Sequence, residues 1–229
     1  MCGRFALGIP RRLVRERFQL PELPDAPERF NIAPGQLVEA VTASPAGRAA
    51  GLYRWGLVPF WARDASMASK LINARAETAA QKPAFRAALR HRRCLVPAQG
   101  FYEWSGPPGR RQPWFFTRRD GQPLALAGLW EHCELPGGEH LLTLALLTCE
   151  ANALVAPAHH RMPVLLEPAD DDAWLDPALQ DPRGLAEILA PRDWPGVIRR
   201  RVSPRVNAAA SEGPDLVEPW EPEGSLLDP

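Results

Sequence analysis

The sequence has no run of about 18 consecutive apolar residues, the length needed for a membrane-spanning helix. Its first residues, MCGRFALGIPRR, also lack the basic segment followed by an apolar segment that marks a secretory signal. We therefore expect a cytoplasmic protein that does not enter a membrane and that joins the nucleoid only when bound to DNA.

Cysteine is scarce, and its spacing is wrong for a metal site. The four cysteines are Cys2, Cys94, Cys133 and Cys149, and no two of them form a C-x-x-C pair. In a reducing compartment, such scattered cysteines are usually free thiols. The sequence thus predicts no metal and no other cofactor.

Lysine is almost absent, so arginine supplies nearly all the positive charge. Lys70 and Lys82 are the only lysines, and the net charge of the chain is zero. The charges are nevertheless segregated: residues 1–119 hold 20 Lys+Arg and 8 Asp+Glu, whereas residues 120–229 hold 7 and 19. Arginine binds phosphate with two parallel hydrogen bonds, so this pattern favours a basic surface for phosphates.

No internal repeat or long low-complexity linker divides the chain, which is 45% hydrophobic and 24% charged. That composition is typical of a globular protein. We expect one domain over residues 1–219, acting as a monomer. Residues 220–229 are acidic and rich in turn formers, which predicts a frayed, disordered tail.

Local patterns predict short helices and strands without a regular β-α-β repeat. Strands are expected at 37–43, 94–97, 113–117, 124–130 and 140–148. Helices are expected at 10–19, within 77–91 after Pro83, and at 150–155, 170–176 and 183–190. The mixture predicts an α+β domain with a mostly antiparallel sheet and peripheral short helices.

The second residue, Cys2, is chemically unusual if Met1 is removed. It then carries an α-amine and a thiol on neighbouring carbons. The amine has an ordinary pKa of about 7.7–8.0 and can form a Schiff base with an aldehyde, after which the thiol closes a five-membered thiazolidine ring. On position alone, the alternative is a frayed terminus without function.

Eight short motifs along the chain point to one family. They are CGRF at 2–5, FNIAPG at 30–35, RWGLVPFWA at 54–62, NARAET at 73–78, RCLVPAQGFYEW at 93–104, AGLW at 127–130, HHRMPVLL at 159–166 and VSPRVN at 202–207. Together they resemble the SOS-response-associated peptidase family of abasic-site processing proteins. The resemblance implies a strand-rich, barrel-like core and a thiazolidine crosslink between the matured cysteine and the ring-opened abasic sugar.

The resemblance also implies roles for individual residues. Cys2 matches the nucleophile, Asn73 the asparagine that positions it, and Glu103 the acid beside the reacting sugar. A carboxyl there can move the protons that ring opening and imine formation require. His159 matches the family histidine, while His160 fills a variable position. An isolated histidine would more often be a structural one beside a strand.

The implied DNA contacts are mostly cationic. Arg75 and Arg161 match phosphate-binding arginines, Arg4 is a further candidate, and Thr148 resembles a DNA contact. Exposed rings stack on the bases of single strands, which makes Trp55 and Pro34 candidates for base contacts. The alternative is that Trp55 and Trp61 belong to the core.

Three functions remain open on the sequence. The first is a protein that binds single-stranded DNA at abasic sites, crosslinks to it, and has lyase-type activity and removal of Met1. The second is a thiol peptidase in which Cys2 and His159 are nucleophile and base. The third is a non-catalytic module that binds single-stranded DNA.

Overall fold

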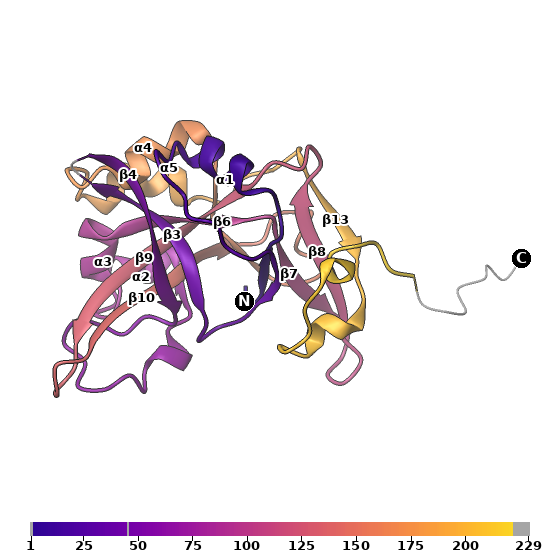
Figure 1. Cartoon of the computed structure of the whole chain (residues 1–229), viewed down its shortest axis with the longest axis horizontal. Helices are drawn as coiled ribbons and strands as arrows, with labels where there is room; N and C mark the ends of the chain where they lie inside the picture. The colour runs from indigo at the N-terminus through magenta and orange to yellow at the C-terminus, as the bar shows by residue number, and fades with distance from the viewer. Residues whose placement is uncertain (1, 45, 222–229) are drawn as a thin grey trace, which may run out of the picture.

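The computed structural model describes residues 2–44 and 46–221 (Figure 1). Most of the predicted tail, residues 222–229, lies outside the described residues. Strands predominate, and the helices are short and lie at the periphery (Figure 1). The predicted α+β class and strand-rich core are confirmed.

The strands fall into two sheets. Their bounds are β1 (Phe5–Leu7), β2 (Arg29–Ile32), β3 (Leu37–Ser44), β4 (Gly47–Trp55), β5 (Asn73–Arg75), β6 (Arg93–Ala98), β7 (Gly100–Ser105), β8 (Gln112–Arg118), β9 (Leu124–Glu134), β10 (His140–Glu150), β11 (Arg161–Pro163), β12 (Leu165–Leu166) and β13 (Val197–Arg201). The helices are α1 (Arg11–Phe18), α2 (Ala76–Ala79), α3 (Arg86–His91), α4 (Pro168–Leu175) and α5 (Ala186–Leu189), with 3-10 turns η1 (Ala68–Lys70), η2 (Pro182–Leu185), η3 (Pro204–Asn207) and η4 (Pro214–Leu216).

Five strands of the larger sheet close on themselves as a barrel, in the order β10-β4-β3-β6-β9 and back to β10. Neighbours in this ring are antiparallel except β4 and β10, which are parallel. A closed ring with an odd number of strands cannot alternate in direction throughout, so one parallel pair is obligatory. The short strands β5 and β11 pair with β10, and β12 pairs with β9.

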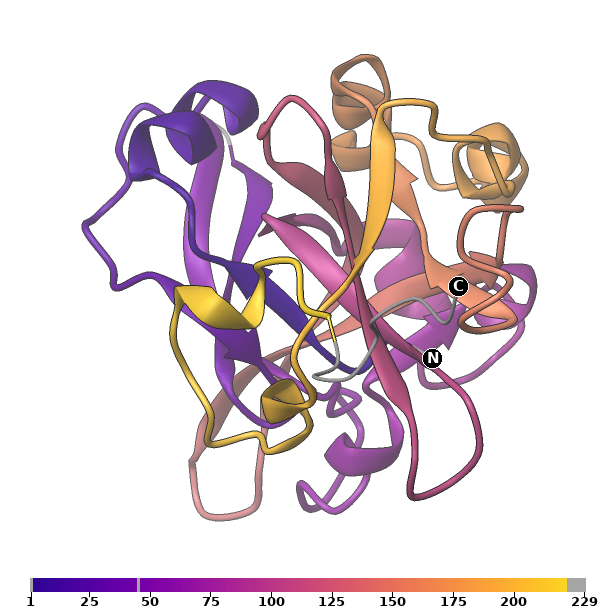
Figure 2. The ribbon, with the colours of Figure 1, turned by 90° about the vertical axis from the view of Figure 1, so that its right-hand side faces the viewer.

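The second sheet has the order β13-β8-β7-β1-β2. Side chains alternate between the two faces of a strand. In β7, Phe101 joins the main core, whereas Tyr102 packs in a smaller cluster with Val206 and Leu216. The C-terminal segment that supplies this cluster lies over the sheet near β1 (yellow in Figure 2).

Buried polar groups fasten the helices to the barrel. Asp171 of α4 is 1% exposed and accepts hydrogen bonds from Arg17 (2.5 Å) and Arg48 (3.1 Å). Trp174 of the same helix donates its indole N–H to the carbonyl of Cys94 at 2.9 Å. These contacts join α1, α4 and the barrel.

The five predicted strands and four of the five predicted helical segments occur. The helix expected at 150–155 was wrong, because that segment forms turns. Asn152 accepts the backbone N–H of Val155 with its own side chain, and Pro157 follows without an N–H to continue a helix.

The buried ion triad predicts a large difference between two neighbouring carboxylates. Asp171→Ala should lower the free energy of unfolding by about 3–5 kcal/mol, because it leaves the buried guanidinium of Arg17 without its carboxylate and removes one of the two that hold Arg48. Asp172 is 89% exposed and pairs with Arg48 alone, so Asp172→Ala should cost about 0–1 kcal/mol. Urea unfolding followed by circular dichroism measures both, and equal losses would contradict the role of Asp171.

Candidate functional site

Cys2 is fully buried where the chain enters β1. Its Sγ lies 4.0 Å from the carbonyl oxygen of Arg4. Burial raises the pKa of the Cys2 thiol well above its ordinary value, and the nearby negative charge of Glu103 raises it further. The thiol is therefore protonated at neutral pH.

Asn73 holds the backbone of Cys2. Its Nδ2 donates a hydrogen bond of 2.8 Å to the carbonyl oxygen of Cys2. Asn73 is placed by β5, which runs parallel to β10 with Asn73 opposite Leu146. Its Oδ1 is buried and has no hydrogen-bond partner among residues 2–44 and 46–221. The Nδ2 of Asn73 thus fixes the backbone of Cys2, and its Oδ1 offers an acceptor.

Glu103 comes to the site from β7 and is 2% exposed. Because side chains alternate, it lies on the same face of β7 as Phe101, toward the main core, and acts electrostatically on Cys2. Burial raises the pKa of Glu103 to about 7, while the positive charge of Arg111 opposes that rise. At neutral pH the carboxyl group is half protonated, so it can both donate and accept a proton.

His159 precedes β11 and is half-buried. Its Nδ1 lies 2.9 Å from the backbone nitrogen of Arg161 and 3.2 Å from the carbonyl oxygen of the same residue, so it can accept from the first when neutral and donate to the second when protonated. Burial lowers the pKa of His159 below its ordinary value. The exposed ring of His160 stacks on it, with 4.3 Å between centroids.

Arg161, expected to contact phosphate, is already engaged inside the protein. It is 9% exposed and forms a two-point ion pair with Glu77 at 2.7 and 2.8 Å. It also donates to the carbonyl oxygen of Thr148 at 2.6 Å. The hydroxyl of Thr148 is fully buried and donates to the carbonyl of Ala74. In this structure both residues brace β5, β10, β11 and α2 and offer little surface to DNA.

Arg4 also turns away from Glu103. Its guanidinium donates to Asn31 Oδ1 (2.6 Å) and to the carbonyl of Val206 (2.8 Å), and it lies over the ring of Trp104 at 5.9 Å. Trp104 follows Glu103 in β7 and so lies on the opposite face of the strand. Arg4 therefore links the N-terminal segment to the C-terminal one.

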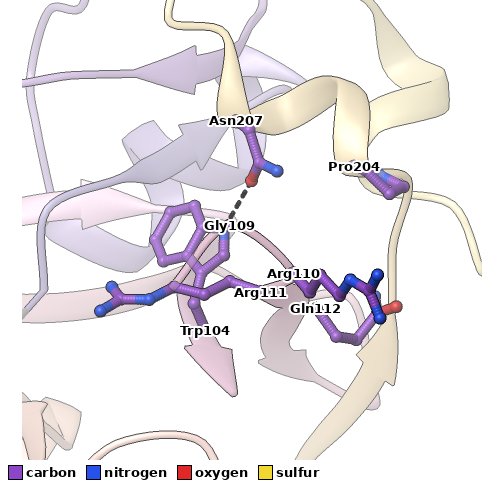
Figure 3. A pocket seen from close by; sticks show the side chains of 7 residues that line it. All are labelled: Trp104, Gly109, Arg110, Arg111, Gln112, Pro204 and Asn207. Carbon is purple, nitrogen blue, oxygen red and sulfur yellow. Dashed lines mark hydrogen bonds between the residues drawn. The ribbon is translucent and has the colours of Figure 1, made fainter. Parts of the chain in front are cut away.

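Trp104 borders an open pocket of about 570 Å³. Its indole donates to Asn207 Oδ1 at 2.7 Å, and the side chain of Arg111 lies beside it (Figure 3). The charge of Arg111 acts on both Glu103 and His159. The motifs did not single out Arg111, which lies in the β7–β8 hairpin after the Gly-Pro-Pro-Gly turn at 106–109.

The remaining candidates differ in exposure. Arg75 is exposed at the end of β5, and no ion pair or side-chain hydrogen bond engages it among the described residues. Pro34 is half-buried and lines a second pocket. Trp55 is 1% exposed and donates to the carbonyl of Ile72, so it is a core residue and presents no ring to a base. Trp61, in contrast, is 48% exposed.

Within residues 2–44 and 46–221, no group of three or more His, Cys, Asp or Glu side chains is arranged to hold a metal ion. Over the same residues, no helix has the length and apolar character that crossing a membrane requires.

The abasic site processing protein YoqW of Bacillus subtilis is 36% identical over 222 residues, which cover 95% of this chain and 99% of YoqW. The abasic site processing protein YedK of Escherichia coli is 29% identical, covering 96% of this chain and 100% of YedK. A solved structure from Bacteroides thetaiotaomicron superposes with a TM-score of 0.84 at 22% identity, covering 96% of this chain and 100% of that one, and shows the same fold.

The family model described as "SOS response associated peptidase (SRAP)" matches residues 1–209, in agreement with the motifs and with the fold. This chain belongs to the SOS response associated peptidase family.

Proposed function

We propose that this protein processes abasic sites in single-stranded DNA by forming a thiazolidine crosslink through Cys2 once Met1 has been removed. The observation that carries the proposal is the burial of Cys2 beside Glu103, with its carbonyl held by Asn73. Relatives of this chain are named abasic site processing proteins, which supports an abasic site as the substrate.

The reaction uses both groups of a terminal cysteine. The α-amine adds to the aldehyde of the ring-opened sugar, and the resulting carbinolamine loses water to give an imine. The thiol then adds to the imine carbon, and its proton passes to the nitrogen, which closes the ring. The Oδ1 of Asn73 is an acceptor that can orient the amine, because the Nδ2 of the same side chain already holds the Cys2 carbonyl.

Glu103 and His159 divide the proton transfers in this proposal. The abasic sugar rests mainly as a closed hemiacetal, so an acid at the ring oxygen speeds exposure of the aldehyde. His159 acts as the acid in its imidazolium form, donating from Nε2 while Nδ1–H faces the carbonyl oxygen of Arg161 at 3.2 Å. Glu103, with a pKa of about 7, supplies the proton for water loss and takes it back on reversal.

In this proposal, some of the candidate arginines bind DNA directly, and others hold the strands that carry the reacting residues. The exposed Arg75 is the phosphate contact that this geometry favours among the candidates. Arg161 acts indirectly, since its pairing with Glu77 and Thr148 positions the strand that follows His159. Arg4 likewise positions the first strand through Asn31.

A thiol peptidase is less well supported. Catalytic cysteines attack as thiolates and are found where their pKa is lowered. Burial and Glu103 raise the pKa of Cys2 instead. The aminothiol route needs no thiolate at the first step, because the amine attacks before the thiol.

Substitution can separate the role of the Cys2 α-amine from the role of its thiol. Cys2→Ser keeps the amine but cannot close a sulfur-containing ring, so with abasic single-stranded DNA it should give only an imine that borohydride traps and heat destroys. An uncleavable residue added before Cys2 should abolish the thiazolidine, because the terminal amine and the thiol then belong to different residues, and should spare DNA binding. Intact mass spectrometry and denaturing gels measure these outcomes, and a heat-stable adduct of Cys2→Ser without reductant would refute the thiazolidine.

The proton-transfer roles predict distinct kinetic defects. His159→Ala should slow crosslink formation, and Glu103→Gln should slow both formation and transfer to competitor DNA, each by about 10²–10⁴-fold. His160→Ala is the matched control and should change either rate little. Time courses with excess competitor measure both rates; release by Glu103→Gln at the wild-type rate would remove the carboxyl from reversal.

The raised pKa of Glu103 predicts a cost in stability. Its pKa rises from an ordinary value of 4.5 to about 7, so the folded state holds the proton more tightly than the unfolded state. The associated stability is fully present below pH 4.5 and is lost as the pH rises through about 7, by about 3 kcal/mol.

Glu103→Gln removes this titration and should therefore be more stable than wild type at pH 8.5 but not at pH 4. Urea unfolding at both pH values measures the difference. The exposed Glu134→Gln is the control, expected to be the same as wild type at both. A pH-independent difference for Glu103→Gln would show that the carboxyl is not the buried titrating group.

A further inference from the structure

Glu103, Trp114 and Arg201 form a row of side chains across three neighbouring strands of the second sheet. Glu103 of β7 is opposite Trp114 of β8, and Trp114 is opposite Arg201 of β13. Residues that face each other across neighbouring strands project to the same side of a sheet. With strands about 4.8 Å apart, the backbone of Arg201 lies roughly 10 Å from that of Glu103.

Two arginines hold the ring of Trp114. The guanidinium carbon of Arg199 lies 5.0 Å from the ring centroid, and that of Arg201 lies 5.4 Å from it. The indole N–H donates to Ser105 Oγ at 2.8 Å, which fixes the ring. We name Trp114, Arg199 and Arg201 the Trp114 clasp.

The clasp also contacts the loop that precedes His159. Arg199 donates to the carbonyl of Leu154 at 3.4 Å, in the loop that leads to His159. The chain therefore places the clasp between the strand that carries Glu103 and the loop that carries His159. β13 lies at the edge of its sheet, beside β8 (Figures 1 and 2).

The charges of the clasp lack a carboxylate partner within the described residues. Arg199 and Arg201 are both exposed, and neither forms an ion pair in residues 2–44 and 46–221. Other arginines, such as Arg17, Arg48 and Arg161, are paired with carboxylates. Two cations over one ring repel each other, and an anion between or beside them removes that cost.

We propose that the Trp114 clasp binds the strand that flanks the reacting sugar, with Arg199 and Arg201 on its phosphates and the half-buried Trp114 ring on a base. Cations with an aromatic ring are the combination that binds single strands without reading sequence. This inference rests on the proposed function for its location, because the row begins at Glu103. It adds a subsite outside the family motifs of the sequence.

The test separates strand binding from chemistry. Fluorescence anisotropy with a labelled single strand that lacks an abasic site measures binding alone, over a series of salt concentrations. The double variant Arg199→Gln/Arg201→Gln should bind about tenfold more weakly, with a log–log salt slope shallower by about 1.4, or 0.7 for each lost phosphate contact. Arg199→Lys/Arg201→Lys keeps the charges and should restore the slope.

The matched control is Arg86→Gln/Arg90→Gln, which removes two exposed charges from α3. It should leave binding near the wild-type value. Trp114→Leu should weaken binding, and Trp114→Phe, which keeps a ring, should weaken it less. If the clasp variants bind as wild type, or if the control loses as much, the subsite is refuted and the clasp only packs the sheet.

Crosslinking to abasic strands gives the second readout. With the clasp variants, the half-saturating DNA concentration should rise while the maximal rate stays unchanged.

Strands extended only on the 5′ side or only on the 3′ side identify which flank is bound. If inorganic phosphate competes as well as a single strand does, the clasp is only an anion site. If the wild type binds single strands but never crosslinks, the proposed function is wrong. The anisotropy data then still decide whether the clasp binds DNA.

Discussion

The pairing of β1 on both of its edges is the constraint on which the site depends. β1 lies between β2 and β7, with Phe5 opposite Ile32 on one side and Phe101 on the other. A chain terminus ordinarily frays, because few contacts restrain it. Here the pairing of β1 holds Cys2 in the interior, where it is fully buried and close enough to Glu103 for that carboxyl to raise the pKa of its thiol. The residue that we propose to react therefore has a fixed position.

Closure of the barrel supplies the other half of the site. An odd ring of strands needs one parallel pair, and β10 is a member of that pair with β4. β10 also pairs with β5 and β11, which bring in Asn73 and Arg161. Arg161 then fixes the backbone to which the ring of His159 is bonded. One long strand thus positions residues that lie far apart in the sequence.

The charge asymmetry of the chain has a different meaning in the fold than in the sequence. Acidic residues of the second half pair with arginines of the first, as Asp171 does with Arg17 and Arg48 and as Glu131 does with Arg92. Part of the segregated charge is therefore neutralised by ion pairs between the two halves of the chain. The exposed arginines without such partners among the described residues include Arg75 in the first half and Arg199 and Arg201 in the second.

The sequence by itself determined the family and the fold class, because motifs and side-chain patterns are local properties. It also predicts the aminothiol at Cys2 and the set of Asn73, Glu103 and His159, which we propose as the site. It could not decide burial, which depends on contacts between distant strands. Only the tertiary structure placed Trp55 and Thr148 in the interior, paired Arg161 with Glu77, and brought Arg201 into line with Glu103 across β8. Those assignments follow from register and closure of the sheets, which no short motif encodes.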